Sequence, residues 1–332
     1  MNIATKTPLV FAWAGFVFLY INFLVGVGLS QLGSLNFILS IIVSFLLYGF
    51  GMYPVVFLSV KHKMNLADAV ERYFSKYALF FYMFVVLVNV GWYSIQLEMI
   101  WEMFHSFVLL IFFSYLFAYG SFKWGFKYLK IFSFFSINLF LLYVLTALYN
   151  TSGNIYIDNQ PLDIFLVASS SLIIFGSWAF SSTTLIMDVA KFGKSFKSSY
   201  IQLLAGLFLG NILLIILGYI YAKYYNINNF QDFISIFGMF IGEFILILNI
   251  WSTNDSNFYN SMNILKKLKI DEKITFFVLP LVSFCLVSLF RDNLFGIIGN
   301  WLLLMGNVGL VMILVWWYIF IREKNDRFNT KG

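Results

Sequence analysis

Charged residues are scarce in this chain. They make up 11% of its 332 residues, whereas about 25% is usual in a soluble globular domain. Because 61% of the residues are hydrophobic, a soluble fold would lack the polar surface needed to cover its apolar atoms. This composition excludes a soluble enzyme, a nucleic-acid-binding protein and a disordered chain. It leaves a protein that crosses the lipid bilayer several times.

Cysteine and histidine are nearly absent as well. Cys285 is the single cysteine, so no disulfide can form within the chain. His62 and His105 are the only histidines, too few for a metal centre of the usual kind. Because the groups that most catalytic sites need are missing, we do not expect an enzyme, and we expect no bound cofactor.

Long hydrophobic runs fill most of the sequence, and the mean hydropathy is +0.86. A transmembrane helix needs about 20 mostly apolar residues. By this rule we predict one all-α membrane domain over residues 1–332, with no domain outside the bilayer. Its ten predicted spans are 9–29, 35–59, 78–103, 105–120, 126–149, 164–187, 199–222, 233–264, 274–290 and 294–321.

The basic residues follow the alternation of these spans. If the N-terminus is cytoplasmic, the cytoplasmic segments contain 19 of the 21 lysines and arginines, and the outer segments contain only Lys223 and Arg291. This bias is typical of a multi-pass protein of the cell (inner) membrane with both termini in the cytoplasm. It also supports ten spans, since one missed span would disturb the alternation.

The outer loop 150–163 divides the ten spans into five and five. Because five is odd, the second half enters the membrane in the opposite orientation to the first. We therefore predict two inverted repeats, about 9–149 and about 164–321, an architecture of many secondary transporters. In such proteins the first helix of each half is often interrupted near the bilayer centre.

Both candidate interruptions are rich in small or polar residues. The first span contains Gly15 and Asn22, and the sixth contains the run Gly176–Thr184. Freed backbone groups at such breaks bind ions and substrates. Glycine and hydroxyl residues also allow ordinary close packing of membrane helices, and both interpretations stand at this point.

One face of the third span is polar. Asn89, Trp92 and Gln96 are spaced at i, i+3 and i+7, so they share a helix face. An indole stacks on a flat ring and carboxamides hydrogen-bond to its edge, so this face suits a heterocycle. An interhelical hydrogen-bond patch with an aromatic anchor would use the same residues.

The eighth span contains a longer polar run, Leu248–Tyr259, which cannot face lipid throughout. The hydroxyls of Ser252 and Thr253, with freed backbone carbonyls, suit a small hard cation. The alternative is a helix end at the cytoplasmic surface. Acidic residues also lie inside predicted spans and are candidates for carrying protons: Glu98, Glu243 and Asp255.

These polar segments resemble the nucleobase:cation symporter-1 family, and most of all its cytosine permease branch. The run Asn249–Tyr259 is similar to that branch's Asn-x-Trp-Thr-Thr-Asn-Asp-Asn-Asn-Leu-Tyr. Further matches follow in family order at Gly26–Ser30, Val90–Trp92, Gly176–Trp178, Asp188–Gly193 and Leu209–Asn211. The resemblance implies a LeuT-like fold with a substrate site between the broken first and sixth helices and the third and eighth.

The resemblance also implies roles for single residues. Trp92 and Trp178 would sandwich the base, and Ser177 and Asn89 would bond its edge. Beside these, we predict Gln96 and Asn249 as further substrate-binding residues. A sodium site would be formed by the carbonyls near Gly15 and Phe18, the Asn249 carbonyl, and the hydroxyls of Ser252 and Thr253.

The chain also departs from the family. Asn89 stands where the cytosine branch has glutamine, and Trp178 where it has phenylalanine. The family typically has twelve spans, against the ten predicted here. Because the first two departures fall in the substrate site, the identity of the base stays open.

We therefore predict a carrier that imports a nucleobase, cytosine-like, or a related small heterocycle by alternating access, with Na⁺ as the coupling ion. Two alternatives remain: a proton-coupled carrier of another heterocycle or an amino acid on the same fold, and a membrane subunit that does not transport. The expected partners are the heterocyclic substrate and the lipid bilayer, with no nucleic acid, and the oligomeric state is open.

Overall fold

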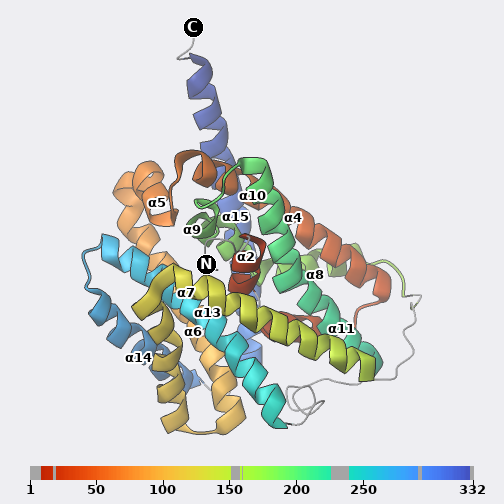
Figure 1. Ribbon diagram of the computed structural model, residues 1–332. Helices are drawn as coiled ribbons and strands as arrows, with labels where there is room; N and C mark the ends of the chain where they lie inside the picture. The colour runs from red at the N-terminus through yellow and green to blue at the C-terminus, as the bar shows by residue number, and fades with distance from the viewer. Residues whose placement is uncertain are drawn as a thin grey trace.

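The computed structural model describes residues 9–17, 20–150, 158, 160–225, 239–290 and 294–329. Within these ranges every regular element is a helix and no strand occurs (Figure 1). The α-helices are α2 (Leu9–Val17), α3 (Tyr20–Gly28), α4 (Ser34–His62), α5 (Leu66–Phe74), α6 (Ala78–Phe104), α7 (Phe107–Asn150), α8 (Ile164–Gly176), α9 (Met187–Ala190), α10 (Phe196–Leu207), α11 (Leu213–Tyr225), α13 (Met239–Lys267), α14 (Glu272–Phe290) and α15 (Leu294–Asn329). Three short helices complete them: the 3₁₀-helix η1 (Ser75–Tyr77) and the π-helices η2 (Ser181–Leu185) and η3 (Phe208–Ile212).

Most of the predicted spans are confirmed as helices. Six helical segments are each long and apolar enough to cross a membrane, and the bent pair Ile164–Gly176 and Ser181–Ala190 makes a seventh. The other three predicted spans are helical in their described parts. The first contains α2 and α3, and residues 18 and 19 between them lie outside the described residues. The fifth is the second arm of α7, and the eighth is α13 with its polar run.

Two boundaries between spans depend on unusual backbone angles. Gly125 has φ 61° and ψ −154°, angles that residues with a side chain rarely adopt, and it kinks α7 between the predicted fourth and fifth spans. His105 has φ 46° in the left-handed region, and its backbone N–H donates to the carbonyl of Trp101, which ends α6. Both positions agree with the boundaries predicted from the sequence.

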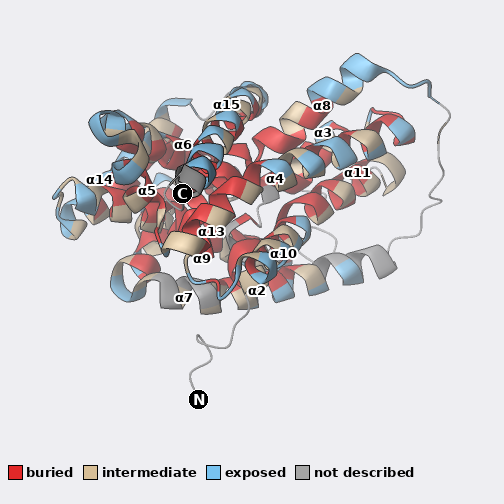
Figure 2. Ribbon diagram, turned by 90° about the horizontal axis from the view of Figure 1, so that it is seen from above, coloured by how far each residue is buried: buried red, intermediate tan, exposed pale blue. Residues whose placement is uncertain are grey.

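Helices of the two predicted halves pack directly on one another. The first-half helices α2, α3 and α4 contact α10, α11 and α8, respectively. The contact between α3 and α11 is very close, because a Cβ atom at Gly26 would lie 2.0 Å from the carbonyl oxygen of Ile215. Seen along the bundle in Figure 2, buried residues gather in the middle and exposed residues on the outer faces. The centre of this bundle is therefore built from both halves.

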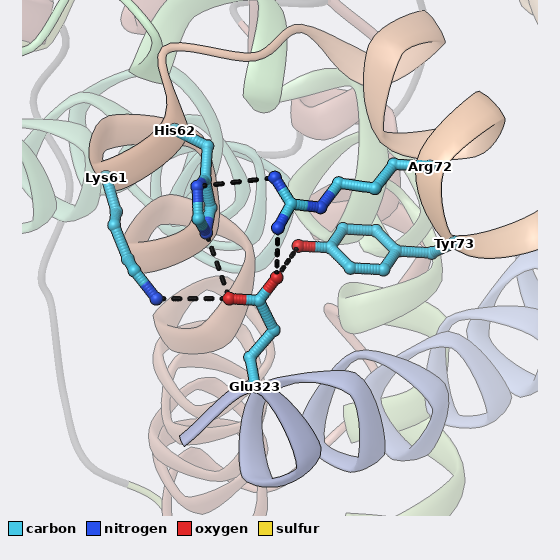
Figure 3. A network of polar contacts seen from close by, with 5 residues as sticks. All are labelled: Lys61, His62, Arg72, Tyr73 and Glu323. Carbon is cyan, nitrogen blue, oxygen red and sulfur yellow. Dashed lines mark hydrogen bonds and ion pairs between the residues drawn. The ribbon is translucent and has the colours of Figure 1, made fainter. Parts of the chain in front are cut away.

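A charged network ties the C-terminal part of α15 to α4 and α5 (Figure 3). Oε2 of Glu323 lies 3.1 Å from Nζ of Lys61 and 3.0 Å from Nε2 of His62. Its Oε1 accepts hydrogen bonds from Nη2 of Arg72 at 2.8 Å and from the hydroxyl of Tyr73 at 2.7 Å. The Glu323 side chain is only 16% exposed, so four partners compensate for its partial loss of hydration.

Replacing Glu323 by glutamine should therefore lower the thermal stability of the detergent-solubilised protein. The amide removes the negative charge that Lys61 and Arg72 share. We expect a loss of about 1–2 kcal/mol, since the site is partly open to water, and a midpoint lower by about 2–6 °C. Glu272→Gln is the control, because it breaks an exposed pair with Lys266 and should leave the midpoint unchanged. Equal shifts in both variants would contradict a special role for Glu323.

Candidate functional site

Two indoles from different halves of the chain stack at the centre of the bundle. The ring of Trp92, on α6, and the ring of Trp178 have centroids 5.9 Å apart and planes inclined by 4°. Their side chains are 2% and 3% exposed. The two aromatic residues predicted to flank a substrate are thus neighbours, although 86 positions separate them in the sequence.

Trp178 lies where the sixth span is broken. The axes of Ile164–Gly176 and Ser181–Ala190 are bent by 53°, and Ser177 and Trp178 form the turn between them. The π-helix η2 follows directly, and π-turns occur frequently at functional sites. The predicted interruption of the sixth span is therefore confirmed, and it positions an indole at the bend.

The gap between the two indoles is narrow. A flat ring needs about 3.5 Å to each neighbour, so two flanking planes must lie about 7 Å apart. The two ring planes are nearly parallel and their centroids are 5.9 Å apart, so the planes lie at most 5.9 Å apart. Trp92 and Trp178 would therefore have to separate by at least about 1 Å to admit a ring. A third indole, Trp301 of α15, packs edge-on to Trp92 at 6.4 Å and 80°. Movement of α6 relative to the bend that carries Trp178 would change the spacing of the two indoles.

The two carboxamides predicted beside Trp92 are fully buried. Asn89 and Gln96 are both 0% exposed. Neither amide group, nitrogen or oxygen, has a hydrogen-bond partner among the residues that the structure describes. Leaving such a group buried and unpaired costs about 1–3 kcal/mol. A ligand whose edge offers donors and acceptors would remove this cost, whereas a purely structural patch would pair the amides with each other.

Ser177 holds the bend in place. Its hydroxyl donates to the carbonyl of Ile174 at 2.7 Å and accepts from Nδ2 of Asn211 at 2.8 Å. The hydroxyl of Tyr48 lies 3.3 Å away. A serine hydroxyl has one proton and two lone pairs, so Ser177 would contact a substrate only by exchanging one of these bonds.

The polar run of α13 lies inside the protein. Asn249, Ser252, Thr253 and Asp255 are all at most 1% exposed, and α13 packs against α6, α7 and α2. The alternative of a helix end at the surface is therefore wrong for these positions. Their polar atoms must be paired within the protein or with a ligand.

The two hydroxyls predicted to bind a cation contact different oxygen atoms. Oγ1 of Thr253 donates to the carbonyl of Asn249 at 3.4 Å, and Oγ of Ser252 lies 3.2 Å from Oγ of Ser133 on α7. Hydroxyl and carbonyl oxygens are ligands that fit a hard cation such as Na⁺. Gly15 belongs to α2, which contacts α13, and Phe18 lies outside the described residues.

The three acidic residues have different surroundings. Asp255 accepts hydrogen bonds from the backbone N–H of Ser121 at 2.8 Å and from its hydroxyl at 2.5 Å, so it joins α13 to α7. Glu98 is 2% exposed and lines a cavity of about 200 Å³ between α6, α14 and α15. Glu243 is only partly buried. Glu243 and Asp255 both lie on α13, the helix that carries Ser252 and Thr253, and of these two Asp255 is the fully buried one.

Comparisons with known proteins agree with the sequence motifs. No family model matches the chain. Cytosine permeases from three strains of Escherichia coli, K12, O6:H1 and O157:H7, are each 34% identical to it over 103 residues. The matched part covers 31% of this chain and 24% of each permease, about a quarter of the length of these curated relatives.

Two solved structures share the fold over nearly the whole chain. One is Mhp1, a nucleobase-cation-symport-1 family transporter in a closed conformation with bromovinylhydantoin bound. It has a TM-score of 0.64 at 13% identity and covers 92% of this chain and 76% of its own. The other is the Eremococcus coleocola manganese transporter in complex with an aromatic bis-isothiourea compound, with a TM-score of 0.59 at 15% identity, covering 96% and 78%.

The fold is therefore that of the LeuT-like transporters, in a multi-pass membrane protein. Within that class, the resemblance to the nucleobase:cation symporter-1 family and its cytosine permease branch is confirmed, in sequence by the permeases and in fold by Mhp1.

Proposed function

We propose that the protein imports a nucleobase, cytosine-like, or a related small heterocycle, coupled to the entry of Na⁺, by alternating access. One observation carries the cargo assignment. Trp92 and Trp178 stack at the break of the sixth span, and the face of α6 that carries Trp92 also carries the buried, unpaired amides of Asn89 and Gln96. The permeases named for cytosine and the hydantoin bound to Mhp1 support it by analogy.

The geometry divides affinity from selectivity. Stacking on an aromatic side chain contributes about 1–3 kcal/mol for each base and tolerates every base. The two indoles would therefore supply affinity without selectivity. Selectivity would come from contacts to the edge of the heterocycle, where Asn89 and Gln96 each offer two hydrogen-bond donors and one acceptor oxygen.

The ion assignment rests on the oxygen set of α13. The Asn249 carbonyl and the hydroxyls of Ser252 and Thr253 are neutral, with carbonyls of α2 as further ligands in this proposal. Because no counter-charge accompanies the ion, Na⁺ would carry its full charge across the membrane potential. At 100 mV one charge supplies about 2.3 kcal/mol, enough for nearly fiftyfold accumulation of cargo at about 1.36 kcal/mol per tenfold.

Proton coupling on the same fold is the second candidate. Asp255 favours it, because a carboxyl at 0% exposure inside a transporter fold is a candidate proton carrier. Its hydrogen bonds from Ser121 equally suit a structural carboxylate. Uptake driven by a pH gradient without Na⁺ would favour this candidate.

A binding panel tests the cargo class. Purified protein is incubated with cytosine, uracil, adenine, hydantoin or single amino acids, and thermal unfolding is recorded, since a ligand that binds only the folded state stabilises it. We expect at least one flat heterocycle, and no amino acid, to raise the midpoint. Stabilisation by amino acids alone would overturn the cargo assignment.

We also propose that both termini are cytoplasmic and that the loop before α8 is outside. At that outer end Lys223 donates a hydrogen bond of 2.6 Å to Asp158, which holds the pKa of this carboxyl below its usual range. In a Cys285→Ala background, Gln160→Cys should react with a membrane-impermeant thiol reagent added to intact cells, and Lys194→Cys should not. Both positions are exposed to solvent or lipid, so the opposite pattern would overturn this topology.

A further inference from the structure

A hydrogen-bonded cluster joins the first span and the bend of the sixth span to a third helix. It consists of Asn22 on α3, Ser177 at the bend of the sixth span, and Asn211 in the π-helix η3. All three side chains are 0% exposed. Asn211 lies at the centre of the 30-residue apolar segment Phe196–Tyr225, so the cluster is far from both ends of that segment.

Backbone carbonyls fix the direction of the first amide. Nδ2 of Asn22 donates to the carbonyl of Val17 at 2.8 Å and to the carbonyl of Gly210 at 3.2 Å. The amide nitrogen is the only donor of the Asn22 side chain, so it must be the atom that faces the two carbonyls. The amide oxygen, Oδ1 of Asn22, then faces Asn211. Nδ2 of Asn211 donates to that Oδ1 at 3.0 Å.

The second contact of Asn211 agrees with this orientation. The Ser177 hydroxyl gives its single proton to the carbonyl of Ile174, so it can only accept from Asn211. Nδ2 of Asn211 donates to it at 2.8 Å. If the amide oxygen and nitrogen of Asn211 were exchanged, its oxygen would face Oδ1 of Asn22 and Oγ of Ser177, neither of which has a free proton to donate. The hydrogen-bond network therefore excludes this orientation.

One polar atom of the cluster is left over. Oδ1 of Asn211 has no hydrogen-bond partner within the described ranges. The other side-chain nitrogen and oxygen atoms of Asn22, Ser177 and Asn211 are paired. Oδ1 of Asn211 is therefore a buried, neutral acceptor with a fixed orientation. It would attract an N–H group of a ligand and repel an atom that presents a lone pair.

We propose that Oδ1 of Asn211 accepts a hydrogen bond from an N–H group of the cargo and so determines specificity. The proposal rests on the proposed function, because it needs a heterocycle beside Trp178, the residue that follows Ser177 in the chain. A cargo that presents an N–H here pairs the acceptor. A cargo that presents a ring nitrogen lone pair or a methyl group leaves it unpaired, at a cost of about tenfold to 100-fold in affinity.

The test uses matched analogues that differ in one donor. Cytosine is compared with 2-pyrimidinone, which lacks the exocyclic amino group, and with 1-methylcytosine, which lacks the ring N1–H. In the wild-type protein we expect one of these losses to weaken binding by about tenfold or more. Asn211→Thr nearly keeps the side-chain volume, but its hydroxyl is one bond from Cβ and cannot occupy the position of Oδ1 while it donates to Asn22 or Ser177. This variant should reduce the ratio of the two dissociation constants, analogue to cytosine, to about one.

A control separates recognition from disturbance of the bend. Tyr48→Phe removes a buried hydroxyl that bonds to the carbonyls of Ile174 and Phe175 and leaves Asn211 intact. It should leave the analogue ratio unchanged. Asn211→Ala replaces Asn211→Thr if the latter does not fold, and it should give the same ratio of about one.

Three results would overturn the proposal. An analogue ratio unchanged by the Asn211 variants would show that Oδ1 does not contact the cargo. A raised half-saturating concentration of Na⁺ with unchanged analogue ratios would show that it contacts the cation instead. Failure of the wild-type protein to bind any heterocycle would overturn the proposed function itself, and this result is seen before any variant is made.

Discussion

Trp92→Ala should weaken the binding of every accepted heterocycle by about tenfold to 100-fold. The variant removes one of two parallel indoles, and each base loses about 1–3 kcal/mol of stacking, at about 1.36 kcal/mol per tenfold. Because stacking does not discriminate between bases, the order of affinities should stay the same. The measurement is competition binding with the full panel of bases.

Trp124→Ala is the matched control for this prediction. Trp124 is 53% exposed and lies outside the site, near the kink of α7, so its loss should leave all affinities unchanged. If Trp92→Ala also leaves the binding of every heterocycle intact, the cargo is not a stacked ring, and the alternative of an amino acid becomes the better account.

Substitution of Asn89 should change selectivity between bases, whereas substitution of Trp92 should change the affinity for all of them. Asn89→Ala removes edge contacts and should change the order in which bases are accepted, since the buried amide pairs with some edges and not with others. Asn89→Gln restores the residue of the cytosine branch and should shift preference toward cytosine. An unchanged order in both variants would assign the edge contacts to other residues.

Ser252→Ala and Thr253→Ala should each raise the concentration of Na⁺ needed for half-maximal uptake by about tenfold or more. Each variant removes one neutral oxygen ligand, and Na⁺ has no opposite charge in this site to compensate. Ser256→Ala is the control on the same helix, because its hydroxyl only donates to the carbonyl of Ser252. Uptake should be measured at saturating cargo over a series of Na⁺ concentrations.

The sodium prediction has a clear contrary outcome. Uptake that ignores Na⁺ and follows a pH gradient would overturn the ion assignment and give Asp255 the coupling role. Asp255→Asn should then abolish uptake, whereas under sodium coupling it should change stability more than the Na⁺ dependence.

Local patterns in the sequence were enough to predict much of the fold. Helical periodicity placed Asn89, Trp92 and Gln96 on one face, and Gly125 and His105 fall at predicted boundaries because their backbone angles interrupt a helix locally. A hydropathy rule describes the fifth and eighth spans poorly, because the kink at Gly125 interrupts α7 and polar residues lower the apolarity of α13.

Contacts between the two halves could not be predicted from the sequence. That Trp178 lies opposite Trp92 was expected from the family resemblance alone, as two residues on either side of a base, because nothing in the spacing of residues so far apart indicates that they are neighbours. The sequence predicts no contact for Trp301, Ser133 or Asn211, since a single tryptophan, serine or asparagine in an apolar helix has no distinctive local pattern. Asn211 is part of a motif match, but the match predicts no role for it. Only the packing of α15, α7 and η3 brings them to the site.

Uptake into liposomes tests the central claim most directly. Purified protein is reconstituted into sealed vesicles, and labelled cytosine, or the base that stabilises the protein best in the binding panel, is added outside with an inward Na⁺ gradient and an inside-negative potential. We predict accumulation above the outside concentration that collapses when the Na⁺ gradient and the potential are abolished, and that is lost in Trp92→Ala. Equal uptake in protein-free vesicles, or accumulation that is the same with and without Na⁺, would contradict a sodium-coupled heterocycle importer.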